Sequence, residues 1–590
     1  MDYTIRTGGE AGQGIHTIGN SLARVFARAG FHVFTHQDYE SRVRGGHNFY
    51  QIRCSDKPVT ASRDSIDILV ALDKESIIRH EKELSENGLI VYDSSALRLK
   101  HNAPHFLDVP FTELALKHGK SRITANTVAT GSVLGMLGMA PDILYGNISR
   151  TFGKKGGDIV QNNQAAAKAG YEFALKNCSR CSFELNAGAR PPLQPRMLMA
   201  GNDAIGLGAV ASGVKFYSAY PMTPSTGIMN YIAGKSGEYG IIVEQAEDEI
   251  AAINMALGAS FAGVRAMTGT SGGGFALMSE GLSLAAMTET PVVIALAQRP
   301  GPATGLPTRT EQGDLQFALY TAHGEFPRII FAPGSPEQAF YLTNRAFDLA
   351  EKYQVPVIIL TDQYLADSEW TVEGLDPARL KYIDYRVRGR DLKEHSPYKR
   401  YAYTETGVTP SAIAGEAGHL VVADSDEHDE EGHITEDAET RIKMVDKRLF
   451  KKLPAIKDEI SPPLFYGDNK PRIVLTGWGS TYGVIREAVD MLSVNNSIAM
   501  LHFSEIYPLP GTAVFDYLSV LNRATISVCI ENNATGQFAR LVKSETGFEF
   551  NAMITKYDGR PFTLDSLPGE LNALIRRLQG TGTGMVSGVR

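Results

Sequence analysis

Three consecutive acidic residues at the start of a helical stretch are the clearest candidates for proton chemistry. Residues 247–249 read Glu-Asp-Glu, and the apolar residues that follow recur at helical spacing as far as Phe261. Small alanine and glycine residues fill the face between them and permit close packing. Acidic residues at a helix start often only complement the helix dipole. The alternative is that one carboxyl turns into an apolar site, where burial favours proton exchange near neutrality.

A proline-rich segment offers hydroxyl groups beside this stretch. Residues 220–226, YPMTPST, end an expected strand, and ligands of α/β proteins bind at the carboxyl edge of the sheet. The two prolines hold the segment extended, and Thr223 and Ser225 carry hydroxyls. The same residues are also compatible with a plain loop and a helix cap at Ser225 or Thr226.

A second loop carries positive charge. Residues 299–315, RPGPATGLPTRTEQGDL, follow another expected strand and are rich in proline, glycine and charge, which is typical of an active-site loop. Arg299 and Arg309 could each bind a carboxylate through two parallel hydrogen bonds. Either could equally be a solvated surface arginine.

A glycine cluster near the N-terminus is a candidate phosphate site. Residues 8–14, GGEAGQG, lie between an expected strand and a helix, where backbone N–H groups favour an anion. A dinucleotide fingerprint requires a third glycine where Thr17 stands, although Asp38 is near the expected acidic position. A turn that only needs glycine backbone angles is the alternative.

The elements that must position these residues alternate between strands and helices. The pattern predicts a multidomain α/β protein with doubly wound sheets. In the first domain it predicts a parallel sheet and a helix from Ile15 to Ala29, with strands at residues 3–7, 32–35, 66–72 and 89–93. The predicted domain organisation is a first domain at 1–185, a proline-rich linker at 186–196, a second domain at 197–370, a polar connecting segment at 371–465 and a smaller third domain at 466–580.

Composition narrows the class of protein. The chain has 590 residues, with 58 basic and 66 acidic side chains and a net charge of -8, so no basic surface for nucleic acid or membrane is expected. No secretory signal and no apolar run of about 18 residues occurs. Four cysteines are too few for a disulfide framework and lack the spacing of an iron–sulfur motif. We therefore expect a cytoplasmic enzyme or enzyme subunit.

Two short patterns have competing interpretations. Cys178 and Cys181 form a lone C-x-x-C without the two further ligands that zinc needs, so a metal or redox role is the less favoured reading. His428 and His433 in HDEEGH could hold a metal, but an acidic, solvated loop or a subunit contact is favoured. No metal site is predicted in this chain.

Several motifs in order resemble one family. The chain is similar to the 2-oxoacid:ferredoxin oxidoreductases, specifically to an α subunit with a γ domain fused at its N-terminus. The α part is matched by YPMTPST, EDEIAAINMALGASFAG, MTGTSGGGFALMSEG, GPATGLPTRTEQGDL, DEHDEEGHITED and ENNATGQ, and the γ part by GGEAGQG and ESRVRGGHNFYQIR. In this family thiamine diphosphate decarboxylates a 2-oxoacid, CoA accepts the acyl group, and iron–sulfur clusters pass electrons to ferredoxin. The resemblance further implies a pyrimidine-binding second domain and a transketolase-C-like third domain.

The resemblance assigns roles to particular residues. Glu249 matches the glutamate that hydrogen-bonds N1′ of the thiamine aminopyrimidine. Thr223, Arg309 and Tyr220 match the part that binds the 2-oxoacid, with Arg309 orienting its carboxylate. Cofactor contacts are implied at Pro221, Gly269, Thr270 and Ser271, and a CoA contact, more weakly, at Gly8, Gly9, Gly12, Gly14 and Arg44.

Absent motifs indicate a partner. The GDG motif that commonly holds Mg²⁺ and the diphosphate does not occur, and GD appears only as GDI, GDL and GDN. A separate β subunit should therefore supply the diphosphate and Mg²⁺ site and a [4Fe-4S] cluster, in an expected (αβ)2 assembly. The departures TSGGG, AEDE and RPGPATG from the family pattern leave the oxoacid open, with 2-oxoglutarate favoured. Two rivals remain: an NAD- or FAD-dependent oxidoreductase that uses GGEAGQG, and a non-catalytic scaffold subunit.

Overall fold

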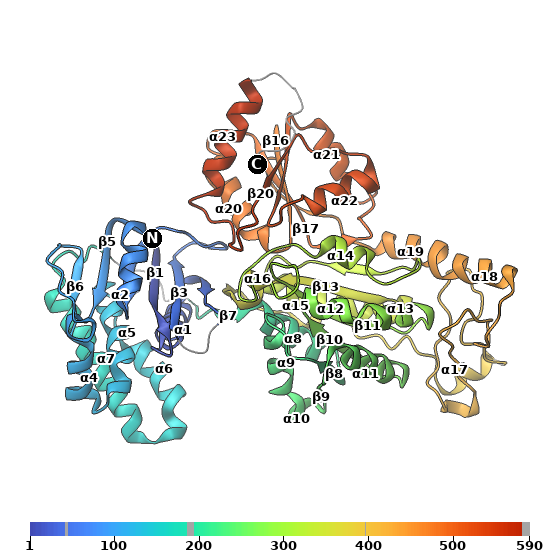
Figure 1. The fold of residues 1–590 in the computed structure, drawn as a ribbon, viewed down its shortest axis with the longest axis horizontal. Helices are drawn as coiled ribbons and strands as arrows, with labels where there is room; N and C mark the ends of the chain where they lie inside the picture. The colour runs from blue at the N-terminus through green and yellow to red at the C-terminus, as the bar shows by residue number, and fades with distance from the viewer. Residues whose placement is uncertain (42–44, 184, 186–193, 396, 581–590) are drawn as a thin grey trace. The chain divides into compact units, whose positions relative to one another are not determined.

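The computed structural model describes residues 1–41, 45–183, 185, 194–395 and 397–580. The chain forms two compact units. The first unit comprises Met1–Met199, Ser368–Gly374 and Thr563–Gly569, and the second comprises Ala200–Asp367, Leu375–Phe562 and the C-terminal residues. Sheets flanked by helices occur in both, which confirms the predicted multidomain α/β class (Figure 1). Arg44 and most of the expected linker lie outside the described residues.

The first unit is built on a mixed sheet. Among the described residues this sheet has eight strands in the order β6-β5-β4-β1-β3-β2-β14-β7. Their bounds are β1 Asp2–Ala11, β2 His32–Asp38, β3 Gly45–Ser55, β4 Ile66–Ala71, β5 Leu84–Tyr92, β6 Phe106–Asp108, β7 Met197–Ala200 and β14 Glu369–Val372. The helices are α1 Ile15–Arg28, α2 Lys74–His80, α3 Ser94–Leu97, α4 Phe111–Gly119, α5 Ala125–Met136, α6 Asp142–Phe152 and α7 Gly157–Asn177.

The prediction of a wholly parallel first sheet was wrong because of β3. This strand runs antiparallel to both β1 and β2, whereas β1, β4, β5 and β6 are parallel. The sequence of β3, GGHNFYQIRCS, did not predict a strand because several of its buried side chains are polar. Buried Arg53, for example, donates to the Asp2 carboxylate at 2.9 and 2.6 Å. Because polar side chains with such partners take buried positions in β3, the alternation of apolar and polar residues on which strand prediction relies is absent.

The first sheet also contains strands from segments that are far away in the sequence. Residues 197–200 were expected to open the second domain, but they form β7, which lies in the first sheet. Trp370 of β14 pairs with Phe34 of β2, and Glu369 accepts a hydrogen bond from Tyr50. These strands return to the first unit from far along the chain, which local sequence patterns do not reveal.

The second unit contains a nearly all-parallel sheet and a smaller sheet. Among the described residues the larger has the order β18-β12-β13-β11-β10-β8-β9, with β18 antiparallel, and the smaller β15-β17-β16-β19-β20. The larger comprises β8 Phe216–Ala219, β9 Ile242–Gln245, β10 Ala266–Thr270, β11 Val292–Gln298, β12 Ile329–Phe331, β13 Pro356–Asp362 and β18 Glu505–Tyr507. The smaller comprises β15 Leu464–Gly467, β16 Ile473–Trp478, β17 Ile498–Phe503, β19 Ile526–Glu531 and β20 Ala552–Thr555.

Helices flank the parallel strands of the second unit, as short βα connections require. Every residue of β11 and β13 is buried, which explains their continuous apolar sequences. The helices are α8 Gly201–Ala211, α9 Thr226–Ala233, α10 Ser236–Tyr239, α11 Glu249–Phe261, α12 Gly272–Leu277, α13 Ser279–Met287, α14 Leu315–Tyr320, α15 Pro336–Tyr353, α16 Gln363–Asp367, α17 Gly389–Glu394, α18 Ala438–Val445, α19 Lys452–Glu459, α20 Tyr482–Leu492, α21 Tyr517–Arg523, α22 Gln537–Thr546 and α23 Leu567–Gly580.

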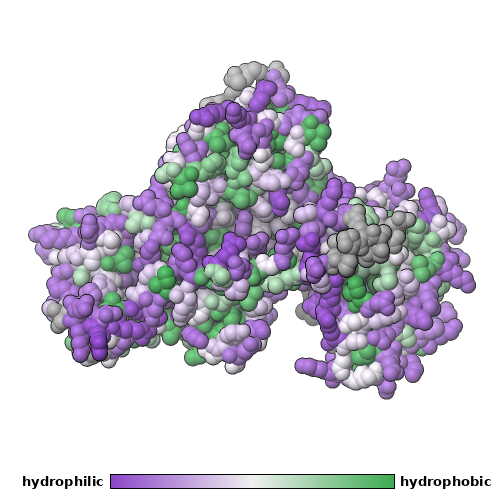
Figure 2. Space-filling view, turned by 180° about the vertical axis from the view of Figure 1, so that it is seen from behind, coloured by the Kyte–Doolittle hydropathy of each residue, from purple (hydrophilic) through white to green (hydrophobic). Residues whose placement is uncertain are grey.

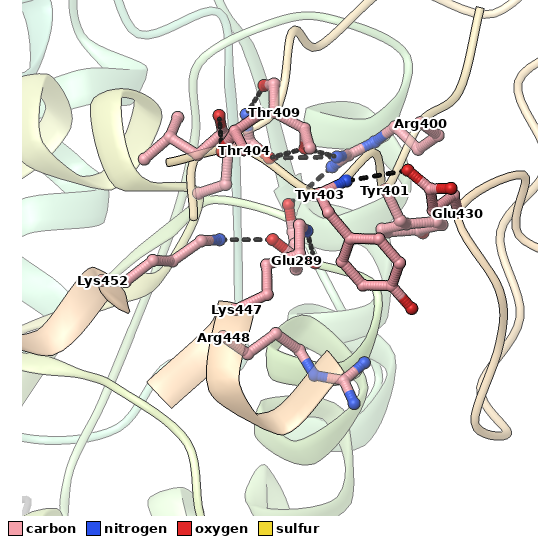
Figure 3. Close-up of polar contacts among 12 residues, drawn as sticks. Glu289, Arg400, Tyr401, Tyr403, Thr404, Thr409, Glu430, Lys447, Arg448 and Lys452 are labelled. Carbon is pink, nitrogen blue, oxygen red and sulfur yellow. Dashed lines mark hydrogen bonds and ion pairs between the residues drawn. The ribbon is translucent and has the colours of Figure 1, made fainter. Parts of the chain in front are cut away.

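A buried ionic cluster holds the connecting segment 375–463 against the turn that follows α13 (Figure 3). Glu289 accepts hydrogen bonds from Lys447 and Lys452, and all three side chains are 1% exposed. Arg400 donates to the Glu289 carbonyl oxygen at 2.7 Å. Because removal of one member of a buried ion pair costs about 3–5 kcal/mol, this cluster should fix the position of the segment.

The acidic run in this segment is less solvated than expected. His428 is fully buried and packs on the Tyr401 ring at 4.0 Å between centroids. Glu427 binds Arg448 through both carboxylate oxygens at 2.7 Å and also pairs with Arg441. The expectation of a solvated loop for HDEEGH was therefore wrong at His428, which is buried against Tyr401, and arginines from the following helical residues neutralise the preceding Glu427. His433 remains exposed.

Two of the four cysteines are paired and two are free. Cys178 and Cys181 form a disulfide immediately after α7, whereas Cys54 and Cys529 are free and buried. Among the described helices, none is both long and apolar enough to cross a membrane. On the face that Figure 2 shows, hydrophilic residues predominate and hydrophobic ones form separate groups.

Candidate functional site

The expected motifs of the second unit meet at one edge of its larger sheet. Strands β8, β10 and β11 are adjacent and parallel, so their carboxyl ends lie at the same edge. The segment YPMTPST leaves β8, TSGGG leaves β10, and the loop 299–314 leaves β11. This is the edge at which open α/β sheets bind ligands.

The three acids of residues 247–249 have separate roles. Asp248 is the N-cap of α11, and its carboxylate accepts a hydrogen bond from the backbone N–H of Ala251 at 2.7 Å. Glu247 is exposed. Glu249 is only 3% exposed, and its Oε1 has no hydrogen-bond partner among the residues that the structure describes. A buried carboxylate oxygen without a partner is costly, so Glu249 has the geometry of a residue that meets a ligand.

The TSGGG turn packs directly against the Glu249 carboxyl. A Cβ atom at Gly274 would lie 2.2 Å from Glu249 Oε1 and 2.1 Å from Thr270 Oγ1, so only glycine allows the turn to approach these two side chains so closely. Ser271 is fully buried, and within the described part of the chain its hydroxyl also has no partner. Buried oxygens without partners, such as these two, could accept or donate hydrogen bonds to a polar ring such as an aminopyrimidine.

The YPMTPST segment is fixed from two sides. Asn202 of α8 donates to the Pro224 carbonyl oxygen at 2.9 Å, and Arg299 donates through Nη1 to the Thr223 carbonyl oxygen at 2.7 Å. Thr223 and Pro221 are half-buried, and Tyr220 is 41% exposed. The structure thus brings Arg299 and Thr223 together at the mouth of the site.

Arg309 lies on the far part of the same loop. Its Cβ and Cγ atoms are 3.2 and 3.5 Å from where a Cβ of Gly559 would be. The neighbouring Thr310 donates its backbone N–H to the Gly559 carbonyl oxygen at 3.3 Å, and Gln312 donates its own to the Asn532 carbonyl oxygen at 2.6 Å. The loop is therefore anchored on residues that border the smaller sheet.

Gly269 has a packing role in the structure. A Cβ at this position would lie 2.4 Å from the hydroxyl of Tyr217, which is completely buried. Burial raises the pKa of Tyr217. Thr270 is likewise buried, and its hydroxyl packs against Gly274.

Sequence reasoning missed Asp314. Its Oδ2 lies 2.6 Å from where a Cβ of Gly272 would be, and this oxygen has no partner in the described ranges of the chain. Burial raises the pKa of Asp314 to about 6, against the opposing effect of Arg299. The signal in the sequence was the aspartate that directly precedes α14, a position that commonly caps a helix.

The N-terminal glycines divide between strand and turn. Gly8 and Gly9 are buried within β1. Gly12 and Gly14 have positive φ angles of 94° and 89° and form the turn into α1. The turn therefore needs glycine for its backbone angles at those two positions, whatever it binds.

Comparisons with known proteins give a consistent result. Two family models match: "Pyruvate ferredoxin/flavodoxin oxidoreductase" over residues 4–173 and "Pyruvate flavodoxin/ferredoxin oxidoreductase, thiamine diP-bdg" over residues 207–447. A 2-oxoacid:ferredoxin oxidoreductase subunit alpha from Sulfolobus is 34% identical over 96% of both chains. This chain belongs to the 2-oxoacid:ferredoxin oxidoreductase α-subunit family. It is therefore part of an oxidoreductase, as the resemblance predicted.

Two further relatives of the 2-oxoacid:ferredoxin oxidoreductase family are informative. A 2-oxoglutarate oxidoreductase subunit KorA from Mycobacterium tuberculosis is 28% identical over 97% of this chain and 92% of the relative. A solved structure of 2-oxoglutarate:ferredoxin oxidoreductase from Magnetococcus marinus, with 2-oxoglutarate, coenzyme A and succinyl-CoA bound, matches with a TM-score of 0.89 and 32% identity. It covers 98% of this chain and 99% of that one. Glu249 and the TSGGG turn fall within the thiamine diphosphate-binding family match.

Proposed function

We propose that this chain supplies the aminopyrimidine half of a thiamine diphosphate site in an enzyme that converts 2-oxoglutarate and CoA to succinyl-CoA and CO2. Electrons would pass through an iron–sulfur cluster of a partner subunit to ferredoxin. The observation that carries the proposal is Glu249: a buried carboxyl that packs against Gly274 and whose Oε1 has no hydrogen-bond partner among the described residues. The bound form of the Magnetococcus marinus relative supports the choice of oxoacid.

Glu249 is positioned for proton exchange. Its backbone begins α11, and Asp248 caps that helix, so the carboxyl itself is left free for a ligand. Thiamine diphosphate, when bound, supplies the nucleophilic carbon and the electron sink for decarboxylation. Glu249 would share a proton with ring atom N1′, and the surrounding buried groups would exclude water from that proton.

The oxoacid would bind at the mouth of the site. Thr223 and Tyr220 lie on the segment that leaves β8, and a positively charged side chain is required for the carboxylate. Arg309 is the residue that the family pattern favours, while Arg299 is the residue held at Thr223 by a hydrogen bond. If Arg309 binds the carboxylate, Arg309→Ala should lower activity with the oxoacid. If Arg299 binds it, Arg299→Ala should do so instead.

The first unit would contribute to CoA binding. The turn with Gly12 and Gly14 follows β1, and Gly8 and Gly9 allow neighbouring side chains to approach the strand closely. Such a glycine-rich turn at a helix start suits the phosphates of CoA. Arg44, from the other motif of this unit, would add a positive charge.

A β subunit would complete the active site in an (αβ)2 assembly. Large apolar side chains are exposed on the elements that form the site: Tyr220, Ile250 of α11, Leu277 of α12 and Leu306, each between 41% and 49% exposed. Exposed apolar residues gathered around a site indicate a surface that another protein covers. The partner would bring Mg²⁺, the diphosphate contacts and the [4Fe-4S] cluster.

Reconstitution tests the proposal. The purified chain should be inactive alone and should reduce ferredoxin when combined with its β subunit, CoA and 2-oxoglutarate. Pyruvate and branched-chain oxoacids, assayed in parallel, identify the substrate. A flavin spectrum in the isolated chain would instead support a dinucleotide-dependent enzyme. A complex that binds no thiamine diphosphate would support a scaffold role.

A further inference from the structure

The end of the loop 299–314 is tied to residues that border the smaller sheet. Gln312 is completely buried, and its Oε1 accepts a hydrogen bond from the Asn532 backbone N–H at 2.9 Å. Its Nε2 donates to the Trp478 carbonyl oxygen at 2.8 Å. Asn532 directly follows β19, and Trp478 ends β16, which is parallel to β19. One buried side chain therefore joins the loop to the ends of two neighbouring strands.

A second glutamine makes the reciprocal connection. Gln537, the first residue of α22, donates to the Gly313 carbonyl oxygen at 2.7 Å and accepts a hydrogen bond from the Gln316 backbone N–H at 2.9 Å. These two backbone groups flank the point where the loop ends and α14 begins. Gln312 and Gln537 thus each make one donated and one accepted hydrogen bond with backbone groups on the other side, and we call this pair the amide clasp.

The segment on the far side of the amide clasp is fixed by buried polar groups of its own. Glu531 is 1% exposed, and its Oε2 accepts a hydrogen bond from the Trp478 indole N–H at 3.1 Å. The side chain of Asn533 accepts a hydrogen bond from the Gly536 backbone N–H at 2.8 Å. Buried polar groups that have their partners hold the backbone in one arrangement. The motif ENNATGQ, residues 531–537, is therefore a firm support for the loop.

The amide clasp lies next to the part of the loop that we assign to the oxoacid. Residues 301–306 are exposed, and Arg309 stands between them and Gln312 in the chain. The backbone N–H of Asp314 donates separately to Gln298 at 2.9 Å, so loss of the clasp would loosen the loop without detaching its end. A displacement of about 1 Å in a group that positions the substrate can lower the rate by about 100-fold. The placement of the loop arginine therefore depends on the clasp.

We propose that Gln312 and Gln537 are positioning residues for the 2-oxoacid, because they hold the loop whose arginine binds its carboxylate. The inference rests on the proposed 2-oxoacid reaction. It gives the ENNATGQ motif a part in substrate affinity, although the motif belongs to the smaller sheet and its flanking helix. The turn with Gly12 and Gly14 that we assign to CoA belongs to the first unit, so loss of the amide clasp should leave CoA affinity unchanged.

The test measures steady-state kinetics of the reconstituted complex with Gln537→Met, which removes both hydrogen bonds of this side chain at nearly constant size. The KM for 2-oxoglutarate should rise by about 5- to 30-fold, the loss expected from one or two hydrogen bonds, while the KM for CoA should not change. Arg540→Met is the matched control, because Arg540 is an exposed residue of the same helix, and it should keep both KM values. A merely structural role would lower the active fraction, and hence kcat, at unchanged KM.

Two further variants make the result independent of the stability of Gln537→Met. Gln537→Glu keeps the acceptor for the Gln316 N–H and loses the donor to Gly313, so its KM for 2-oxoglutarate should rise, but less than in Gln537→Met. Combined with the arginine variant that loses oxoacid binding, Gln537→Met should cause little further loss, because no arginine remains to be positioned. Thermal unfolding of each complex shows that the compared variants are folded.

The outcomes separate this inference from the proposed function. An unchanged KM for 2-oxoglutarate in both Gln537 variants, or a loss confined to kcat, overturns the inference and leaves the proposed function intact. An equal rise in the KM for CoA, or full additivity with the arginine variant, overturns it as well. If the wild-type complex converts no 2-oxoacid, the proposed function itself fails.

Discussion

In the glycine triplet 272–274, alanine at Gly274 should weaken thiamine diphosphate binding, whereas alanine at the neighbouring Gly273 should not. In Gly274→Ala the new methyl group would lie 2.2 Å from Glu249 Oε1 and 2.1 Å from Thr270 Oγ1, both buried. Overpacking a well-packed interior costs about 1–3 kcal/mol, and the Glu249 carboxyl must move away from residue 274 to relieve it. Thiamine diphosphate affinity in the reconstituted complex should therefore fall by about 5- to 150-fold.

Gly273→Ala is the matched control for this variant. Its Cβ would meet only the Ala303 carbonyl oxygen, at 3.7 Å, which is an ordinary contact. Replacing an exposed glycine in a helix by alanine should stabilise the chain slightly, by up to about 1 kcal/mol. Calorimetric titration of thiamine diphosphate and thermal unfolding measure both effects. The reasoning is refuted if Gly274→Ala binds the cofactor like Gly273→Ala.

Four further predictions address the substrate, the partner and stability. Arg309→Ala should lower kcat/KM for the oxoacid by about 2–4 kcal/mol at constant CoA affinity; if steady-state assays find this loss in Arg299→Ala instead, the carboxylate belongs to Arg299. Ile250→Asp, on an exposed apolar position of α11, should weaken association with the β subunit in size-exclusion chromatography, without lowering the melting temperature of the isolated chain. Burial lowers the pKa of Lys447 to about 7. Between about pH 7 and 10 the unfolded chain therefore holds a proton that the folded chain has lost, and the free energy of unfolding should rise with pH. Glu289→Gln should lower the free energy of unfolding by about 3–5 kcal/mol. Denaturant unfolding at pH 7 and 9 checks both statements, and a fall in stability over this range would contradict the first.

The sequence correctly predicted features that depend on short, local motifs. Helix α11 followed from an acidic start and helical spacing, and α1 began at Ile15 as expected, whereas Glu249 was singled out among the three acids by the family resemblance. The segment YPMTPST was correctly placed at the end of a strand, because its prolines and the preceding apolar residues mark that boundary. Family membership followed from the order of several such motifs.

Features that depend on distant partners were not predictable in this way. Strand β3 was missed because buried residues such as Arg53 are satisfied by partners elsewhere in the sheet. Strand β14 returns to the first sheet from more than 300 residues away in the chain, and β7 joins the same sheet instead of opening the second domain. Asp314 was missed because its significance lies in an unpartnered oxygen near Gly272, which only three-dimensional packing reveals.

The exchange of the thiamine C2 proton tests the central claim most directly. Wild-type and Glu249→Gln chains, each assembled with the β subunit, would be loaded with thiamine diphosphate and quenched after short times in D2O for analysis by NMR. If Glu249 is the proton-sharing carboxyl, the exchange rate of the bound cofactor should fall by about 100-fold or more in Glu249→Gln, while the complex remains assembled. Exchange near the wild-type rate would contradict the account and assign proton sharing to another group, with Glu247 the next candidate.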